Sequence, residues 1–373
     1  MNKTFYIFTY GCQMNKNDSE ILAGLLSEEM DFSLAENPDD ANVLIFNSCA
    51  VRRKAETRLF SRIQEFASLR KKHNRDQIIV LAGCVPQYEK EDIKERIPFV
   101  DYFIGPNSID SLPKLLKSTI KSALLLNNNR NLEVAYDTTM RSKTDQAWIS
   151  IMYGCNNFCS YCIVPYTRGR EVSRPKENIF KEIKSLPNSY KKIILLGQNV
   201  NSYGKGLYDN YDFADLLNDI SKLENIQWLS FLTSHPKDIS EKLIKTIANI
   251  TKCDKEIHFP IQSGDNEILK LMNRGYSREQ YYSIVKILRT YIPDIKISTD
   301  LIVGFPGETE EQFQNTINAV KELNFYRINT AAYSPRKGTK AESMSPQLSE
   351  ELKHKRLLEL QSIVDIYAGI KKK

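Results

Sequence analysis

Short apolar runs and longer stretches with helical periodicity alternate along the whole chain. In the first third, apolar runs predict buried strands at Phe5–Thr9, Val43–Asn47 and Ile78–Ala82, and a fourth strand is expected over Asp101–Ile104. Amphipathic stretches between them predict helices, such as Ser19–Leu26 and Ala55–Leu69. This alternation is typical of βα units that build a parallel sheet, so the pattern predicts an α/β fold.

The second half repeats the alternation with six further strand candidates. They are Trp148–Tyr153, Ile193–Gly197, Trp228–Thr233, Ile257–Pro260, Ile297–Gly304 and Tyr326–Tyr333. Six βα units are too few for a closed barrel of eight, so we expect an open partial (β/α)6 TIM barrel. The polar stretch between the two series predicts a linker. The expected organisation is a Rossmann or flavodoxin-like open parallel-sheet domain over residues 1–123, a linker over 124–147 and the partial barrel over 148–367.

Composition supports a folded protein. With 373 residues, 41% of them hydrophobic and 26% charged, the chain is long enough for two ordinary domains and is not expected to be disordered. The first residues lead into a strand and not into a continuous apolar segment, so no signal peptide is expected. No stretch approaches the roughly 18 apolar residues of a membrane span. We therefore expect a cytoplasmic protein without a membrane partner, and the net charge of +6 permits nucleic-acid binding without requiring it.

Three of the seven cysteines stand close together, at Cys155, Cys159 and Cys162. Thiolates are the preferred ligands of iron–sulfur clusters, and a cubane of four irons with three thiolate ligands keeps one iron open for another molecule. The alternative is a zinc site, which needs a fourth protein ligand. No His or further Cys follows within about thirty residues to supply it. The CxxxCxxC spacing therefore predicts an iron–sulfur cluster with an open iron.

The other informative cysteines each follow one of the early strands, at Cys12, Cys49 and Cys84. Parallel strands present their C-terminal ends at one edge of a sheet, so we expect these three thiols to converge there on a second cluster. The small residues beside them, Gly11, Ser48 and Gly83, are expected to let the backbone approach the cluster closely. The alternative is three unrelated buried thiols. The seventh cysteine, Cys253, has no partner spacing and is read as an ordinary thiol.

The CxxxCxxC spacing, with the aromatic Tyr161 directly before the third cysteine, resembles the signature of the radical S-adenosylmethionine (SAM) enzymes. The resemblance implies a [4Fe-4S] cluster whose open iron chelates the methionine part of SAM. One electron from that cluster would cleave the sulfonium and give a 5′-deoxyadenosyl radical. Tyr161 is expected against the adenine of the cofactor.

Polar residues near the ends of later strands are the expected contacts of this cofactor. They are Gln198, Asn199, Ser234, Gln262 and Asp300. At the mouth of a partial barrel their amides, hydroxyl and carboxylate could bind the ribose and the amino-acid end of SAM. The alternative for each is turn chemistry, because such residues are common in loops.

Four stretches resemble those of the radical-SAM methylthiotransferases, and the resemblance covers nearly the whole chain. They are Tyr10-Gly11-Cys12-Gln13-Met14-Asn15, Asn47-Ser48-Cys49-Ala50-Val51-Arg52, Val164-Pro165-Tyr166-Thr167-Arg168-Gly169-Arg170-Glu171 and Thr233-Ser234-His235-Pro236. The first two favour the branch that adds a methylthio group to C2 of N6-isopentenyladenosine beside the tRNA anticodon. The other branches act on threonylcarbamoyl-adenosine in tRNA or on a ribosomal protein.

The resemblance implies two [4Fe-4S] clusters that act together. The auxiliary cluster at Cys12, Cys49 and Cys84 would hold a sulfur species, while one SAM supplies the methyl group and another supplies the radical. A base must leave its stack to reach such a centre. On proximity in sequence, Tyr166 and Arg168 are expected on the base side, and Arg52 and Arg53 on flanking phosphates.

The family usually carries a small C-terminal RNA-binding β-barrel of the TRAM type. Here the sequence predicts a helix over Leu357–Ile370, then three lysines, so that barrel is expected to be absent. Two alternatives stay open: the sequence stops short of the barrel, or the two domains bind tRNA on their own. In the second case binding would be weaker and more sensitive to salt.

An alternative hypothesis, from a different functional class, is a non-enzymatic iron–sulfur protein, such as an electron carrier or redox sensor. Such a protein would need neither an open iron nor the polar residues at the barrel mouth. For the enzyme, the expected partners are tRNA bearing isopentenyladenosine, an electron donor of flavodoxin or ferredoxin type and a sulfur donor of unknown identity. We expect the enzyme to be a monomer.

Overall fold

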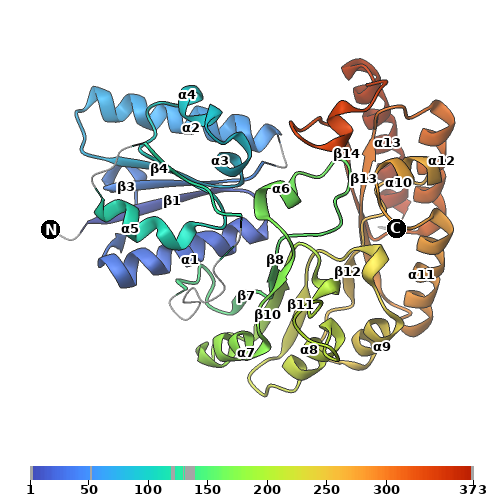
Figure 1. The fold of residues 1–373 in the computed structure, drawn as a ribbon. Coiled ribbons are helices and arrows are strands. Elements are labelled where there is room, and N and C mark those ends of the chain that lie inside the picture. Colours follow the sequence, from blue (N-terminus) through green and yellow to red (C-terminus); the bar gives the residue numbers. More distant parts are fainter. Residues whose placement is uncertain (1–2, 51–52, 119–121, 129, 131–138, 371–373) are drawn as a thin grey trace. The chain divides into compact units, whose positions relative to one another are not determined.

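The computed structural model describes residues 3–50, 53–118, 122–128, 130 and 139–370. Two compact units make up the chain (Figure 1). Unit 1 is formed by Met1–Asn156 and Ile163–Tyr190, and unit 2 by Asn157–Cys162 and Lys191–Lys373. The chain thus passes from one unit to the other and back within the CxxxCxxC loop.

Unit 1 is built on a parallel sheet in the order β2-β1-β3-β4-β5-β6. Its strands are β1 (Thr4–Tyr10), β2 (Ser33–Leu34), β3 (Val43–Ser48), β4 (Ile78–Gly83), β5 (Tyr102–Ile104) and β6 (Ala123–Leu125). The order of the first five strands is that of flavodoxin-like folds. The predicted open parallel-sheet fold is therefore confirmed.

Helices cover both faces of this sheet (Figure 1). Helices α1 (Gln13–Met30) and α5 (Leu112–Lys117) lie on one face, and α2 (Arg53–Lys72), α3 (Cys84–Glu89) and α4 (Asp92–Arg96) on the other. Helix α1 starts six residues before the predicted Ser19, because its first two turns bury polar side chains such as Asn15, Asn17 and Asp18. A search for apolar periodicity does not detect a helix of this kind.

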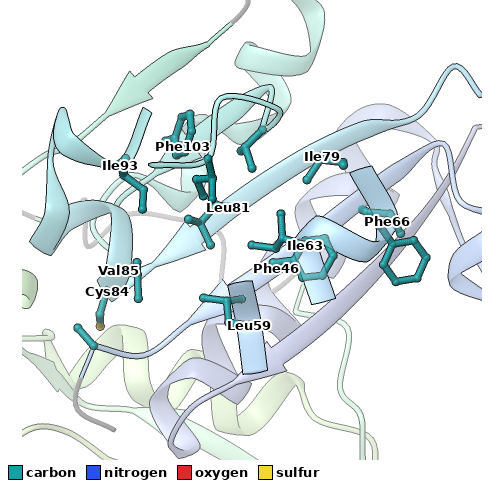
Figure 2. Close-up of a cluster of buried hydrophobic side chains, with 14 of the residues drawn as sticks. Phe46, Leu59, Ile63, Phe66, Ile79, Leu81, Cys84, Val85, Ile93 and Phe103 are labelled. Atoms are coloured by element: carbon teal, nitrogen blue, oxygen red, sulfur yellow. The ribbon is translucent and has the colours of Figure 1, made fainter. Parts of the chain in front are cut away.

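A hydrophobic core fixes α2 to the sheet. Phe46 and Leu81 of the sheet pack in one cluster with Leu59, Ile63 and Phe66 of α2, and each of these side chains is at most 2% exposed (Figure 2). Burying a side chain of this size stabilises the fold by about 1.5–3 kcal/mol. The cluster extends to Cys84 at the C-terminal end of β4. The cysteine edge of the sheet therefore rests on a rigid core.

The predicted linker is more ordered than its polar composition suggests. Its first residues belong to β6, which pairs with β5. Farther along, Arg141 forms ion pairs with Glu20 of α1 and Glu182 of α7 (Lys176–Ser185), and all three side chains are at most 6% exposed. Three consecutive apolar residues suffice for an edge strand, and the neighbouring asparagine run obscured them. Residues 131–138 of the predicted linker lie outside the described residues.

The rest of unit 1 follows the predicted linker. It consists of β7 (Gln146–Ser150), β8 (Met152–Tyr153), β9 (Val172–Ser173), α6 (Val164–Arg168) and α7. The single strand predicted over Trp148–Tyr153 is interrupted at Ile151. After the interruption, β8 pairs antiparallel with β9.

Unit 2 contains five of the six strands predicted for the partial barrel. Strands β10 (Lys192–Leu196) and β11 (Trp228–Phe231) pair in parallel, as do β12 (Glu256–His258), β13 (Lys296–Val303) and β14 (Arg327–Ala332). Helices are α8 (Phe213–Ser221), α9 (Glu241–Asn249), α10 (Asn266–Leu271), α11 (Arg278–Tyr291), α12 (Glu310–Leu323) and α13 (Glu350–Ile370). The predicted alternation of strands and helices is confirmed.

Short 3-10 helices occur in both units, at Pro38–Asp40, Ile109–Ser111, Val200–Ser202, Pro236–Asp238 and Lys340–Ser343. Among the residues that the structure describes, no helix has the length and apolar character needed to cross a membrane.

Candidate active site

Strand register brings the first set of cysteines to one edge of the unit 1 sheet. Strands β1, β3 and β4 are parallel neighbours, and Tyr10, Ser48 and Gly83 lie beside one another at their C-terminal ends. The cysteines follow within two residues of these positions, at Cys12, Cys49 and Cys84. This is the edge at which open α/β sheets bind ligands. The geometry fits three ligands supplied by three separate turns.

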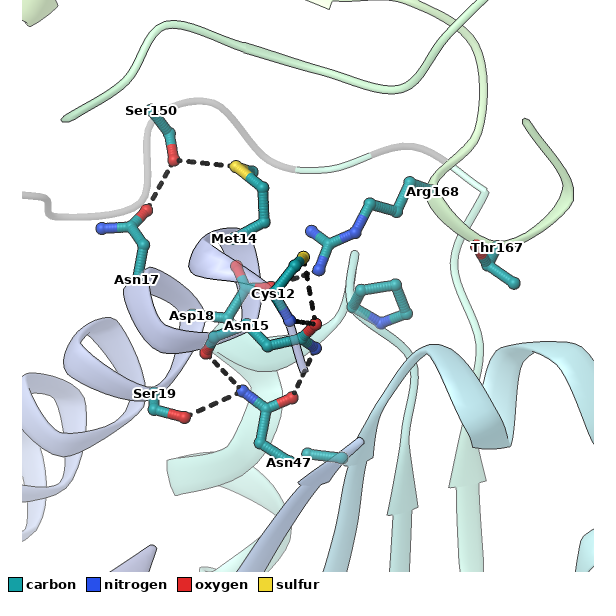
Figure 3. Close-up of polar contacts among 12 residues, drawn as sticks. Cys12, Met14, Asn15, Asn17, Asp18, Ser19, Asn47, Ser150, Thr167 and Arg168 are labelled. Carbon is teal, nitrogen blue, oxygen red and sulfur yellow. Dashed lines mark hydrogen bonds and ion pairs between the residues drawn. The ribbon is translucent and has the colours of Figure 1, made fainter. Parts of the chain in front are cut away.

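Two buried asparagines tie these turns together (Figure 3). The Asn15 amide donates to Asn47 Oδ1 (3.1 Å) and to the Ser48 carbonyl (2.9 Å), and the Asn47 amide donates to the Asn15 carbonyl (2.7 Å). The Ser48 hydroxyl in turn donates to the Ala82 carbonyl at 2.6 Å. The turns after β1, β3 and β4 are thus joined by hydrogen bonds. This role was not predicted from the sequence, because the hydrogen-bond partners are far apart along the chain.

Two glycines are required by this packing. Gly83 has a φ of +96°, and a Cβ there would lie 2.6 Å from Asn47 Oδ1 and even closer to the Ser48 carbonyl oxygen. At Gly11 a Cβ would lie 2.5 Å from the Asn15 side-chain Cγ. From the sequence, these glycines were expected to let the backbone approach a cluster closely. In the structure the space beside them is filled by neighbouring protein atoms.

The electrostatic surroundings of the first set are mixed. Cys12 is the N-cap of the 18-residue α1 and lies at the positive end of the helix dipole. Burial raises the pKa of the Cys84 thiol, and the charge of Arg168 opposes that rise. Iron removes the thiol proton outright when it binds sulfur. Arg168 therefore favours the thiolate form of Cys84, which is the form that binds a metal.

Arg168 belongs to a buried ion-pair cluster. Asp18 Oδ1 pairs with Arg130 Nη1 at 2.7 Å and Asp18 Oδ2 with Arg168 Nη2 at 2.8 Å, and the three side chains are at most 4% exposed. The charge of Asp18 raises the pKa of Arg168 above its usual range, against the effect of burial. Arg168 was expected on the tRNA base. The structure instead places its guanidinium inside unit 1, next to Cys12 (Figure 3).

The CxxxCxxC loop is held at both ends by backbone hydrogen bonds. In unit 1, the Cys155 N–H donates to the Gly169 carbonyl at 3.2 Å. In unit 2, the Ser160 N–H donates to the Met272 carbonyl at 3.0 Å, and the Ser160 carbonyl accepts from the Ala341 N–H at 2.8 Å. The first contact anchors Cys155 within unit 1, and the other two anchor Ser160, next to Cys159, within unit 2.

Two donors face the sulfur of Cys159. Arg274 Nη1 lies 3.3 Å and His235 Nε2 3.9 Å from Cys159 Sγ. His235 Nδ1 accepts the Lys237 N–H at 3.2 Å, so the neutral ring carries its proton on Nε2. Burial, aided by the charge of Arg274, lowers the pKa of His235 to about 2, which keeps the ring neutral. Both groups can donate to a Cys159 thiolate.

Arg274 was not identified from the sequence. It follows helix α10 in the run Asn273-Arg274-Gly275, which reads as an ordinary loop. Its Nη1 also donates to the Tyr161 hydroxyl at 3.2 Å, and its Nη2 donates to the Pro260 carbonyl at 2.9 Å. Burial raises the pKa of Tyr161 well above its usual value, so this phenol stays neutral.

Three of the residues expected to contact SAM carry buried polar atoms that a ligand could pair. Both polar side-chain atoms of Gln198, the Ser234 hydroxyl and Gln262 Oε1 are buried, and none has a hydrogen-bond partner among the described residues. Buried polar atoms are normally paired, by protein, water or ligand. These three residues at the ends of β10, β11 and β12 therefore suit a polar ligand such as SAM.

Two other expected contacts already have partners. The Asn199 amide donates to Asp238 at 2.8 Å, while Asn199 Oδ1 is buried and has no hydrogen-bond partner in the described part of the chain. Asp300 accepts from Asn329 at 2.9 Å and lies 3.1 Å from His258 Nε2. A ligand could use the remaining acceptor of Asn199. Asp300 would first have to share its carboxylate.

The residues expected to contact RNA lie in different settings. Tyr166, in α6, is 49% exposed and can present its ring to a base. Arg52 lies outside the described residues, and so does the side chain of Arg53.

The cysteine sets do not have the geometry of a site for a single metal ion. Within the described ranges, no three His, Cys, Asp or Glu side chains gather closely enough to share one metal ion. A cubane makes a different demand, because each thiolate binds a separate iron.

Comparison with known proteins shows the family to which the chain belongs. The Radical SAM superfamily matches residues 149–320, and the uncharacterized protein family UPF0004 matches residues 4–105. The tRNA-2-methylthio-N(6)-dimethylallyladenosine synthase of Thermoanaerobacter pseudethanolicus is 45% identical over 98% of this chain and 79% of its own length. The enzyme of the same name from Clostridium botulinum is 44% identical over 99% of this chain and 83% of its own length. The chain belongs to this synthase family.

Solved structures agree on the fold. The cobalamin-dependent SAM radical enzyme OxsB matches with a TM-score of 0.60 at 13% identity, over 97% of this chain and 56% of that protein. At that identity the likeness concerns the fold alone. As a radical-SAM member of the synthase family, the chain uses SAM and two [4Fe-4S] clusters as cofactors.

Proposed function

We propose that this member of the synthase family adds a methylthio group to C2 of N6-isopentenyladenosine (dimethylallyladenosine) beside the anticodon of tRNA. The observation that carries the proposal is a pair of cysteine sets in a chain 45% identical to a synthase of that name over 98% of its length. One set lies at the edge of the unit 1 sheet, and the other lies on the CxxxCxxC loop. An electron carrier needs only one cluster, fully ligated by protein.

Each cysteine set has its own role in this proposal. Cys155, Cys159 and Cys162 hold the radical-SAM cluster, and Cys12, Cys49 and Cys84 hold the auxiliary cluster. When bound, the two clusters and SAM supply the radical and the methylated sulfur. Asn15 and Asn47 keep the auxiliary ligands in place through their hydrogen bonds.

The remaining residues bind the cofactor and the base. Gln198, Ser234 and Gln262 offer SAM the buried polar atoms that lack partners among the described residues. Tyr161 supports the adenine from a position set by the Arg274 hydrogen bond. Tyr166 offers an exposed ring on which a base taken out of the tRNA stack can lie.

The same proposal includes the electron donor, the cellular location and the oligomeric state. A flavodoxin or ferredoxin is the proposed electron donor, because a [4Fe-4S] cluster accepts one electron at a time. Six thiolate ligands need a reducing compartment, which supports a cytoplasmic location. We propose that the enzyme acts as a monomer.

The test is an anaerobic reaction of the reconstituted protein with SAM, dithionite and tRNA bearing isopentenyladenosine. Mass spectrometry of the digested nucleosides is expected to show the methylthio adduct, with 5′-deoxyadenosine as a second product. Transfer RNA without the isopentenyl group, or with threonylcarbamoyl-adenosine, is expected to give no adduct. An adduct on threonylcarbamoyl-adenosine alone would overturn the substrate assignment.

Cysteine variants separate the two sets. Cys84→Ala is expected to abolish the adduct while 5′-deoxyadenosine still forms, and Cys159→Ala is expected to abolish both. Cys253→Ala is the matched control, because Cys253 is also buried but lies in neither set. It is expected to keep full activity. If two clusters assemble and neither product forms, the electron-carrier function is favoured instead.

A further inference from the structure

Arg168 has one guanidinium nitrogen that no residue in the described part of the chain accepts from. Its Nη2 pairs with Asp18, the side chain is 4% exposed, and Nη1 is buried without a hydrogen-bond partner among the described residues. A buried guanidinium normally has its donors satisfied, because each unpaired donor costs about 1–3 kcal/mol. The unused donor therefore indicates a ligand.

The surroundings of Arg168 show where that ligand lies. After Asp18, the charges of Cys84 and Cys12 are the next largest influences that raise the pKa of Arg168. Helix α6, which ends at Arg168, contacts α3, which begins at Cys84. Figure 3 shows the guanidinium beside Cys12. The unused donor thus lies among the auxiliary cysteines.

Charge balance within the ion-pair cluster does not account for Arg168. The Asp18 carboxylate already has a buried partner in Arg130, at 2.7 Å. A second buried cation costs desolvation energy unless another anion compensates it. A [4Fe-4S] cluster with three thiolate ligands is such an anion.

We propose that Arg168 Nη1 donates a hydrogen bond to a sulfur atom of the auxiliary cluster and thereby raises the reduction potential of that cluster. Hydrogen bonds to sulfur and nearby positive charge both favour the reduced, more negative state. This inference rests on the proposed function, which assigns Cys12, Cys49 and Cys84 as ligands. It gives Arg168 a role at the cluster in place of the expected contact with the base.

The test isolates the auxiliary cluster in the full chain by replacing Cys155, Cys159 and Cys162 with Ala. In this background Arg168→Met removes the charge and the hydrogen bond, while Asp18 keeps its pair with Arg130. Arg168→Lys keeps the charge but loses the planar pair of donors. Asp18→Asn removes the opposing negative charge. Arg170→Met is the control, since Arg170 is an exposed arginine two residues away.

The readouts are iron and sulfide content and the midpoint potential from a dithionite titration followed by electron paramagnetic resonance. Arg168→Met is expected to lower the equilibrium constant for reduction about tenfold, a shift of about 59 mV to more negative potential. Arg168→Lys should shift it less, Asp18→Asn should shift it to more positive potential, and Arg170→Met should not shift it.

The signs of these shifts separate the proposal from a structural role. Loss of folding would reduce cluster content in both Arg168→Met and Asp18→Asn, but it would not move their potentials in opposite directions. A fully loaded Arg168→Met protein with unchanged potential would overturn this proposal alone. If the parent triple variant holds no cluster, the ligand assignment fails and this inference fails with it. If Arg168→Met does not assemble a cluster, Arg168→Lys and Asp18→Asn decide the question.

Discussion

Replacing Gly83 by alanine should disturb both the stability of unit 1 and its cysteine edge. Gly83 has φ +96° and ψ −150°, a region that is essentially restricted to glycine and costs about 1–3 kcal/mol for other residues. The added methyl would also collide with the Ser48 carbonyl and with Asn47 Oδ1, at 2.6 Å. Ser48 cannot withdraw, because β3 pairs with strands on both sides. Overpacking of this kind typically costs another 1–3 kcal/mol or so.

The expected total is therefore about 2–6 kcal/mol. At about 2–4 °C per kcal/mol for a unit of this size, the Tm of unit 1 should fall by at least about 4 °C. Thermal unfolding followed by circular dichroism measures the fall. Iron content in the Cys155, Cys159 and Cys162 triple variant measures whether Cys84 still reaches its place, and we expect it to drop below half.

Gly206→Ala is the matched control for backbone strain alone. Gly206 also has a positive φ, of +74°, but a Cβ there would meet no atom within 4 Å. It should lower the stability of unit 2 by only about 1 kcal/mol, because only the cost of the left-handed backbone applies. If Gly83→Ala costs no more stability than Gly206→Ala and keeps its iron, the close packing of Gly83 on Ser48 does not position Cys84.

Buried polar side chains at Glu308, Asn47 and Arg274 support three further predictions about stability and cluster properties. Burial raises the pKa of Glu308 from 4.5 to about 6, so its contribution to stability is present below pH 4.5 and is lost as the pH rises through 6. The full loss of stability is about 2 kcal/mol, and urea unfolding at pH 4 and pH 7.5 should show a smaller difference in Glu308→Gln than in the parent. Asn47→Ala should lower the free energy of unfolding by about 1–3 kcal/mol and reduce the iron bound at the auxiliary cysteines, because the buried Asn15 amide loses the Asn47 Oδ1 acceptor. Unchanged stability in urea unfolding together with unchanged iron content would contradict this prediction. Arg274→Met should make the potential of the radical-SAM cluster more negative by about 59 mV, with Arg278→Met as the control, and a redox titration of a protein lacking the auxiliary cysteines would detect it.

Much of the architecture is encoded locally. The strands at β1, β3 and β4 consist of apolar runs whose length and flanking residues identify them without a partner. The cysteines that follow these strands predict a shared edge, because parallel strands all end on the same side. The CxxxCxxC loop likewise carries its spacing within one short segment. These features were therefore accessible from the order of residues alone.

The contacts around the cysteines were decided by tertiary structure. Asn15 and Asn47 are 32 residues apart, Cys159 and Arg274 115 apart, and Asp18 and Arg168 150 apart. The asparagine, aspartate and arginine residues among them read as loop or surface residues from their neighbours in sequence. Each is buried because a distant partner satisfies its charge or hydrogen bonds.

The order of residues therefore specifies the fold class, both sets of cysteines and the kind of chemistry they support. Long-range packing places Arg168 inside unit 1 and brings Arg274 and His235 to face Cys159. This difference arises because apolar periodicity and ligand spacing act within one strand, helix or loop. Buried polar side chains, in contrast, are stable only when long-range folding brings their partners together.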